Sequence, residues 1–492
     1  MRTQQQQLSA STGPRIERLP SGRVLASITA VLGLAFFFEA VDSGTINYFL
    51  PVFAGEFNLH FESLGAIGTM SNVGVLIGTL LSGPLADRFG RKRIIIAAVI
   101  MWGFAGVWQA TVTSLDWLVV VRIAIGLGIG LQLPATITLL AELVPSRLRA
   151  RYLISMLALF PLGISAAGLI CYMLIPLVGW RGVSVIESVP VLTALLIWKF
   201  VPESPVWLEL KGRHEDAHAA MTTLERKIEA STGRTLPLVD RAQVVEASET
   251  RAQQVPLRRM VGKEHWRTTL MLTIQWPAML LALYGLQTWF SMMFVQQGIS
   301  IQSSIGYSTI MTLGGVFGAF LVPWLLKKYG RKPVAILTAL LAFVVAIAYG
   351  SVLGSVVLMV IFGMLFNMFT YALGQVSNTY TSELWPTSLR SAGVGSANSI
   401  GRLGAIAGPI LLGFIMGGFG VQLQCSSVAP CTSWPQSPSG CLAARQGGPS
   451  SWPTNCSRRT AAATCNVHPS GVPRQELTPT KLSNQTTNSL RP

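Results

Sequence analysis

Two carboxylates lie three residues apart inside an apolar run. Glu39 and Asp42 belong to the stretch FFFEAVDSGTI, residues 36–46. On a helix, residues at this spacing share a face. An ionisable side chain at bilayer depth costs a few kcal/mol, so such a residue is expected to have a function. A carboxyl is charged beside a cation and neutral when buried without one, which suits a proton carrier. We therefore predict that both residues face the protein interior and bind protons.

Two arginines lie in other apolar runs. Arg122 is near the start of the fourth run, and Arg402 is about half-way along the last one. A buried guanidinium presents a fixed fork of donors that suits a carboxylate. Arg402 therefore predicts an anionic substrate; the alternative is a structural arginine that donates to backbone carbonyls. Glu187 and Lys199 are further ionisable residues in apolar runs.

The elements that carry these residues are membrane-spanning helices. Half of the 492 residues are apolar and 12% are charged, about half the charged fraction of a soluble domain. Apolar segments of about 20 residues recur, which is the length that crosses the hydrocarbon core of a bilayer, whereas a barrel shows short alternating segments. We predict an all-α polytopic membrane protein with helices at 25–52, 63–85, 93–112, 117–141, 152–176, 181–201, 268–293, 304–326, 333–351, 354–380 and 391–418.

Basic residues concentrate in alternate loops. The loops at 86–93 and 327–332 are rich in Lys and Arg, whereas those at 53–62 and 296–304 have none. By the positive-inside rule, the N-terminus and the long segment 202–266 are cytoplasmic. This distribution explains the net charge of +16 without a nucleic-acid partner. We expect an integral protein of the plasma (inner) membrane whose first helix is an uncleaved anchor.

The sequence contains an internal repeat. GPLADRFGRKR at 83–93 returns as PWLLKKYGRKP at 323–333, and AELVPSRLRA at 141–150 returns as SELWPTSLRS at 382–391. Two pairs at one offset of about 240 residues indicate two homologous bundles, a pattern of secondary transporters. The predicted organisation is a cytoplasmic tail, a six-helix bundle, a cytoplasmic linker with short helices, a five-helix bundle and a second tail, at 1–24, 25–201, 202–267, 268–420 and 421–492.

These motifs resemble the major facilitator superfamily. The loop at 83–92 resembles that family's signature between helices 2 and 3, RIAIGLGIG at 122–130 is similar to its helix 4 motif, and PESPVWL at 202–208 is similar to the sugar-porter signature, with Val206 where an Arg is usual. The resemblance implies two six-helix halves that rock around a central cavity. It also implies a cytoplasmic gate in which Asp87 latches the outward-facing state, although these charges alternatively serve only topology and surface ion pairing. The gate residues are Gly83, Asp87, Arg88, Gly90, Arg91, Glu142, Arg149, Glu383 and Arg390.

The same resemblance implies a transport site. In proton-coupled relatives an acid in helix 1 pairs with the helix 4 arginine, which corresponds to Asp42 and Arg122; the alternative is a static buried ion pair. Glu39 matches the first Asp of the Asp-Gly-x-Asp motif of organic-acid symporters in part, which implies a second proton site or a substrate contact; alternatively, Glu39 is a solvated bystander. Arg402 matches their Gly-Arg-x-Gly pattern. Further candidates for the cavity wall are polar or aromatic residues of helices 4, 7 and 10, namely Gln132, Gln287, Trp289, Asn367, Tyr371, Gln375 and Asn378.

The composition changes sharply after residue 420. Residues 421–492 are rich in Ser, Pro, Thr, Gly, Cys and Arg and contain no run that crosses a membrane, so the expected twelfth helix is absent. We expect a disordered tail, and the abrupt change indicates a shifted reading frame or a fusion. Five of the six cysteines lie there, with spacings that match no zinc or redox pattern.

The predicted function is proton-coupled symport of a small organic anion by alternating access. One alternative is an exporter or facilitator of the same fold for sugars or other metabolites. Another is a non-transporting remnant or sensor, because the twelfth helix is missing. No nucleophile, metal cluster or phosphate loop indicates an enzyme, and we expect no cofactor or metal. The expected partners are the substrate, protons and the bilayer, and the protein is expected to be monomeric.

Overall fold

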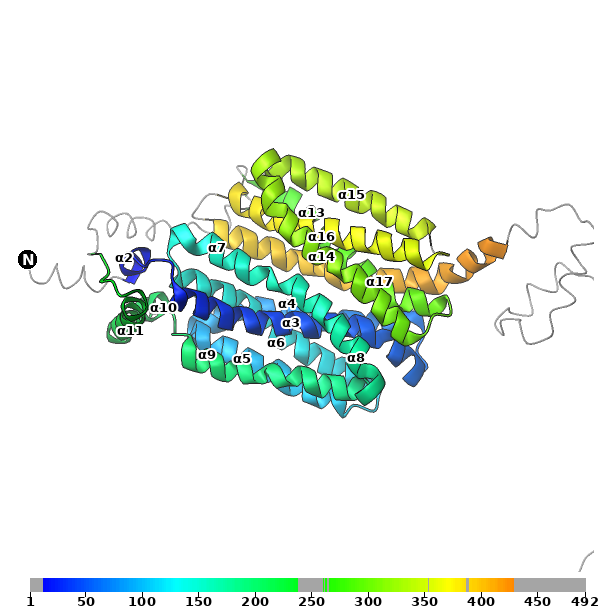
Figure 1. Cartoon of the computed structure of the whole chain (residues 1–492), viewed down its shortest axis with the longest axis horizontal. Coiled ribbons are helices and arrows are strands. Elements are labelled where there is room, and N and C mark those ends of the chain that lie inside the picture. The colour runs from blue at the N-terminus through cyan, green and yellow to red at the C-terminus, as the bar shows by residue number, and fades with distance from the viewer. Residues whose placement is uncertain are drawn as a thin grey trace, which may run out of the picture. The chain divides into compact units, whose positions relative to one another are not determined.

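The structure is a computed structural model that describes residues 12–237, 260, 262, 265–352, 354–385 and 389–428, without the side chains of 390–392 and 416–428. The described residues form helices and their connections (Figure 1). The first half of the chain contributes α3 (Arg23–Glu56), α4 (Phe61–Phe89), α5 (Arg91–Ala110), α6 (Leu115–Leu143), α7 (Ser146–Leu157), α8 (Leu159–Ser188), η1 (Val189–Leu192) and α9 (Thr193–Phe200).

The run from α7 to α9 crosses the bundle twice. It spans Ser146–Phe200, 55 residues, which is more than twice the length that one crossing needs. Gly179 interrupts α8 with φ 67° and ψ 177°, a conformation that costs glycine little because it has no Cβ. Beyond this point the chain returns along α5 to α9 (Figure 1).

The second half repeats the first. It consists of α13 (Trp266–Gln296), α14 (Ile301–Tyr329), α15 (Arg331–Ser351), α16 (Val356–Leu384) and α17 (Arg390–Val428). Helices α4 and α14 have 29 residues each and begin 240 residues apart, and α5 and α15 begin at the same offset. The internal repeat in the sequence is therefore also a repeat of helices.

The described residues contain ten segments long and apolar enough to span a membrane, one of which is the folded-back run of 55 residues. Each of the eleven predicted helices falls within these segments to within three residues. The predicted all-α membrane fold is confirmed. Helix α17 continues to Val428, beyond the predicted change at 420, and the prediction for the rest of the tail lies outside the described residues.

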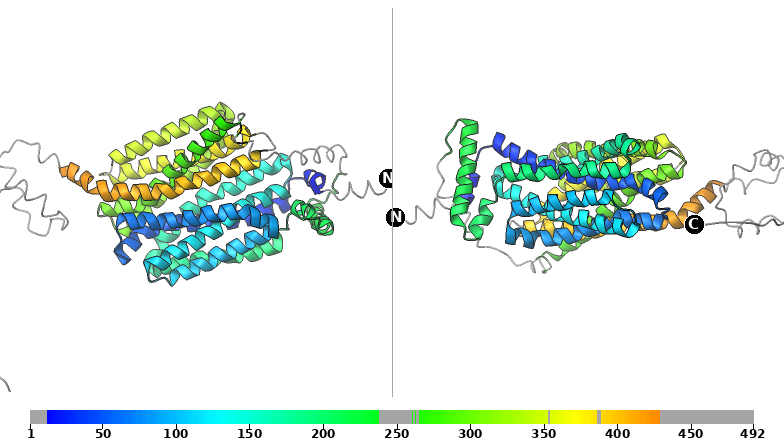
Figure 2. Two further views of the ribbon diagram at one scale, coloured as in Figure 1. Left: turned by 180° about the vertical axis from the view of Figure 1, so that it is seen from behind. Right: turned by 90° about the horizontal axis from the view of Figure 1, so that it is seen from below.

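Three short helices gather at one end of the bundle (Figure 2). They are α2 (Thr12–Glu17), α10 (Pro205–Leu210) and α11 (His214–Thr232). Arg15 and Arg18 each form an ion pair of 2.6 Å with Glu225 of α11, and the Glu17 carboxylate accepts a hydrogen bond of 3.0 Å from the backbone N–H of Ser146. These residues therefore fasten α11 to the start of α7. We call this side of the bundle the linker end, and the opposite side the far end.

Candidate transport site

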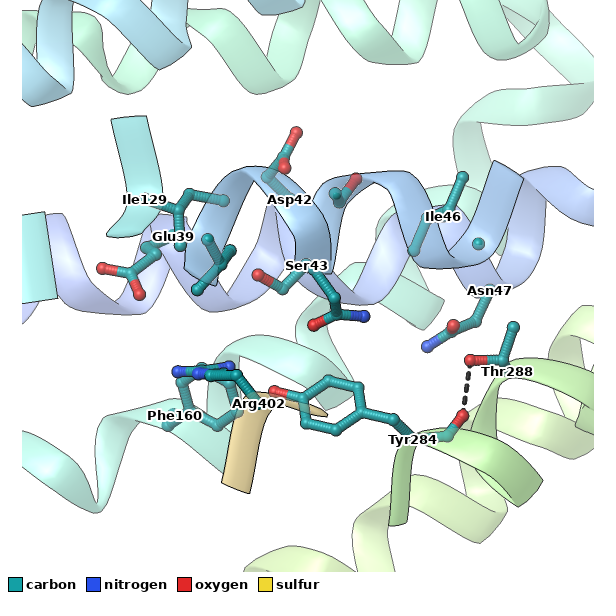
Figure 3. Close-up of a pocket in the computed structure, with 14 residues that line it drawn as sticks. Glu39, Asp42, Ser43, Ile46, Asn47, Ile129, Phe160, Tyr284, Thr288 and Arg402 are labelled. Carbon is teal, nitrogen blue, oxygen red and sulfur yellow. Dashed lines mark hydrogen bonds between the residues drawn. The ribbon is translucent and has the colours of Figure 1, made fainter. Parts of the chain in front are cut away.

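A cavity lies between the two halves of the bundle (Figure 3). Its volume is about 40 Å³, enough for a few water molecules. The first half contributes most of the lining and the second half the rest, through Glu39, Asp42, Ser43, Ile46, Asn47, Gly68, Ser71, Asn72, Val75, Ile129, Phe160, Tyr284, Thr288 and Arg402.

A larger cavity of about 180 Å³ adjoins the first one. Phe160, Tyr284 and Arg402 line both cavities. The larger cavity is also lined by Tyr371, Gln375, Asn378 and Asn398, and otherwise mainly by apolar side chains. Two aromatic rings and a guanidinium thus stand where a small polar cavity meets a roomier apolar one.

Glu39 and Arg402 face each other across the halves. Glu39 is 1% exposed, and the cation that acts on its carboxylate is Arg402. No ion pair within 4 Å joins them in the described part of the chain, and Glu39 Oε2 and Arg402 Nε are buried without a hydrogen-bond partner. The guanidinium therefore has a free donor beside a cavity, and it is one cation that two carboxylates can share.

Asp42 belongs to a second charged cluster, within the first half. It points away from the Arg402 side of α3 (Figure 3), and the cation that acts on it is Arg122 of α6. Arg122 also acts on Glu187 of α8, which accepts a hydrogen bond of 3.1 Å from Thr45. Arg122 is 1% exposed, and its Nε and Nη2 have no hydrogen-bond partner.

The predicted pair of Asp42 and Arg122 is thus close enough to interact, but the described residues show no ion pair within 4 Å between them. One buried cation balances one of the two carboxylates of this cluster, and burying an uncompensated charge is expensive. The arrangement therefore favours a proton on one carboxyl, with Arg122 neutralising the other.

The other predicted cavity residues divide into two groups. Tyr371 and Gln375 line the larger cavity, whereas Gln287 is buried, lines neither cavity and has an Nε2 without a hydrogen-bond partner in the described residues. Gln132, Trp289 and Asn367 line neither cavity and bind groups on neighbouring or their own helices: Gln132 accepts from Trp102 (2.8 Å), Trp289 donates to the Pro409 carbonyl (3.1 Å) and Asn367 donates to the Gly363 carbonyl (3.0 Å). For all the predicted cavity residues, a role in substrate binding stays a prediction.

The predicted gate residues meet at the linker end. Arg91 pairs with Asp87 at 2.9 Å and with Glu142 at 3.3 Å. The repeat places Arg331 and Glu383 in an equivalent pair at 2.8 Å.

Five gate residues do not join these pairs. Gly90 lies between α4 and α5 with φ 105°. Gly83 has open space around it, while Arg88 lies over the Phe89 ring at 5.2 Å. Arg149 is exposed, and the Arg390 side chain is outside the described set.

At the far end the halves touch closely. A Cβ added at Gly168 of α8 would overlap the Thr309 hydroxyl of α14. A Cβ at Gly65 of α4 would lie 2.8 Å from the Pro409 carbonyl oxygen of α17, and the Thr69 hydroxyl donates to the Ile406 carbonyl at 3.1 Å. These contacts close the far end of the interface between the halves.

Sequence reasoning missed several residues that line the cavities. Phe160 and Tyr284 lie in apolar helices, where aromatic side chains usually serve packing. Asn47, Asn72 and Thr288 are polar residues within such helices, and only their polarity could have pointed to them.

Comparisons with known proteins agree with this architecture. The family model of the Major Facilitator Superfamily matches residues 32–409. The niacin transporter NiaP of Acinetobacter baylyi is 32% identical over 82% of this chain and 90% of that protein. The 4-hydroxybenzoate transporter PcaK of Pseudomonas putida is 29% identical over 80% of this chain and 86% of that protein.

Solved structures share the fold. A partially occluded, inward-open structure of the xylose transporter XylE from E. coli has a TM-score of 0.62 at 20% identity, covering 81% of this chain and 95% of that one. Ten apolar segments, a repeated half and a family match over most of the chain identify the class of protein. The chain belongs to the major facilitator superfamily and is an integral membrane transporter, not an enzyme.

Proposed function

We propose that this protein is a symporter that moves a small aromatic carboxylate together with protons. The observation that carries the proposal is Arg402, a half-buried guanidinium with a free Nε donor beside the cavity and two aromatic rings. A carboxylate satisfies such a donor with a charge-assisted hydrogen bond. Phe160 and Tyr284 supply apolar surface for a ring. The names of relatives that transport niacin, 4-hydroxybenzoate and gallate support this substrate class.

Proton coupling follows from the number of charges. Arg402 faces Glu39, and a substrate carboxylate would compete with Glu39 for the same cation. Two carboxylates beside one guanidinium repel each other, so the substrate binds best when Glu39 carries a proton. Glu39 is therefore proposed as the group that couples anion binding to proton binding.

The cluster of Asp42, Arg122 and Glu187 provides a second proposed proton site, within the first half. With one proton between Asp42 and Glu187, Arg122 is balanced and the cluster is neutral. Loss of that proton leaves a net negative charge in a buried site, which is unfavourable. We propose that the proton is exchanged only when the halves move apart and water enters, and that residues 25–201 and 268–420 are the moving units.

The remaining features of the proposal concern placement. The basic loops at the linker end favour a cytoplasmic linker and N-terminus. We also propose that the protein lies in the plasma membrane and acts as a monomer. The far end would then be the outer side, closed in this structure, with the larger cavity on the cytoplasmic side.

Uptake into proteoliposomes tests the proposal. Nicotinate, 4-hydroxybenzoate and gallate are compared with nicotinamide, the neutral counterpart of nicotinate, with and without an inwardly directed proton gradient. We expect uptake of at least one carboxylate to rise with the gradient and nicotinamide to be excluded. Uptake of equal rate with and without the gradient would identify a facilitator and remove the symport claim.

A further inference from the structure

The larger cavity has two walls of different chemistry. All six residues that the first half contributes are apolar, among them Phe36, Leu133 and Phe160. The second half contributes the polar groups, which include the Arg402 guanidinium and the side-chain amides of Gln375, Asn378 and Asn398. A small molecule in this cavity would therefore rest an apolar face on the first half and direct its polar groups towards the second half.

The cavity has room for one six-membered ring. Its volume is about 180 Å³, and an apolar protein cavity of about 150 Å³ binds benzene. In the proposed function, on which this inference rests, Arg402 binds the carboxylate of such a ring. The edge of the ring opposite the carboxylate then lies away from Arg402, and the groups that it meets there decide which ring substituents are accepted.

The three amides lie on helix faces that line the cavity. Asn398 precedes Arg402 by four residues on α17, so the two residues share a face and lie about 6 Å apart along the helix axis. This separation is close to that between two substituents at opposite positions of a benzene ring. Gln375 and Asn378 are three residues apart on one face of α16. A substituent opposite the carboxylate can therefore reach the amides while the carboxylate contacts Arg402.

The amide of Asn378 presents an acceptor to the cavity. Its nitrogen donates to the Gly374 carbonyl at 3.0 Å, and a carbonyl oxygen only accepts, so this hydrogen bond fixes the orientation of the amide. In the described part of the chain no group donates to the amide oxygen. The side chains of Gln375 and Asn398 make no hydrogen bond to the described residues, and each amide offers both a donor and an acceptor.

We propose that these three amides bind a ring hydroxyl opposite the substrate carboxylate, so that the transported acid is a 4-hydroxylated aromatic carboxylate. A phenolic hydroxyl both donates and accepts. It can donate to the Asn378 oxygen and accept from Gln375 or Asn398 at the same time. An unsubstituted ring displaces water from the amides and gives no hydrogen bond in return, which is unfavourable. A ring nitrogen, as in nicotinate, accepts but does not donate, so it leaves the Asn378 oxygen without a partner.

Titration calorimetry on the full chain in nanodiscs tests the proposal, with 4-hydroxybenzoate, benzoate, 4-fluorobenzoate and nicotinate as the probes. Fluorine is close to a hydroxyl in size but cannot donate a hydrogen bond. Loss of one hydrogen bond corresponds to about a tenfold loss of affinity, so we expect 4-hydroxybenzoate to bind about tenfold tighter than each of the other three. Equal affinity for 4-hydroxybenzoate and 4-fluorobenzoate would overturn this proposal and leave the role of Arg402 intact. Binding of none of the four would overturn both.

Two substitutions on α16 locate the preference. Asn378→Leu removes the acceptor at a similar side-chain volume and should reduce the preference for 4-hydroxybenzoate over 4-fluorobenzoate from about tenfold to about twofold or less. Thr379→Val is the matched control, because Thr379 lines neither cavity and donates to the Gln375 backbone carbonyl at 3.1 Å; it should keep the preference. Asn398→Leu replaces the first variant if Asn378→Leu does not reach the membrane. An undiminished preference in the amide variant, or its loss in Thr379→Val as well, would overturn the proposal.

Discussion

Replacing Arg402 should weaken the binding of anionic substrates selectively. Arg402 Nε is buried without a partner beside the cavity, so a substrate carboxylate would gain a charge-assisted hydrogen bond there. A hydrogen bond to a charged group contributes about 1.5–3 kcal/mol. Since about 1.4 kcal/mol corresponds to a tenfold change in affinity, Arg402→Gln should weaken binding of the transported carboxylate roughly 10- to 100-fold.

The assay is titration calorimetry or scintillation proximity on purified protein in nanodiscs, over a range of pH. Glu39→Gln is the matched variant, because it removes the carboxylate that competes for Arg402 but keeps the shape of the side chain. It should bind the anion with little dependence on pH, whereas wild-type binding should weaken as pH rises. Wild-type affinity in Arg402→Gln would show that Arg402 does not bind the carboxylate, and an unchanged pH dependence in Glu39→Gln would show that Glu39 does not compete for it.

Three further predictions concern the ends of the bundle. Asp87→Asn removes a 2.9 Å ion pair of an exposed carboxylate, which contributes about 1 kcal/mol or less to stability; transport should slow while membrane insertion is unchanged, and wild-type uptake would exclude a latch. Burial acts to raise the pKa of the Glu225 carboxyl, but the hydrogen bonds from Arg15 and Arg18 outweigh this effect and lower the pKa. At pH values above the ordinary pKa of a glutamate, the ion pairs therefore stabilise the contact with α11. This stabilisation is lost as the pH falls through the lowered pKa of Glu225. Hydrogen exchange of α11 should rise in acid in wild type and at neutral pH in Glu225→Gln; identical exchange in both would contradict this. Gly168→Leu would overlap Thr309 and should hold the far end open, seen as increased labelling of an introduced cysteine there; unchanged labelling would show that the glycine contact does not close this end.

The helices and the charged residues of the site were readable from the sequence. A membrane helix appears as an apolar run, and a charge within such a run is conspicuous because of its cost. This explains why Glu39, Asp42, Arg122 and Arg402 were found. The pairing of Asp42 with Arg122 was expected from the resemblance alone. The pairing of Glu39 with Arg402 was not expected, because it depends on the rotation of each helix about its axis.

Other features depend on contacts between distant parts of the chain. Phe160 and Tyr284 line the cavities, but an aromatic residue in an apolar helix looks the same whether it packs or lines a cavity. Gln132 was predicted as a cavity residue from its polarity, and its hydrogen bond with Trp102, 30 positions away, could not be read from the sequence. The contact of Arg15 with Glu225 joins residues 210 positions apart, which no local pattern reveals.

Proton movement driven by the substrate tests the central claim most directly. Proteoliposomes containing the protein and a pH-sensitive dye in the lumen receive nicotinate, 4-hydroxybenzoate or gallate outside, with no pH difference at the start. A transported carboxylate should acidify the lumen, and Glu39→Gln should lower the number of protons that enter with each substrate molecule. Entry of the carboxylate without any proton entry would contradict the central claim.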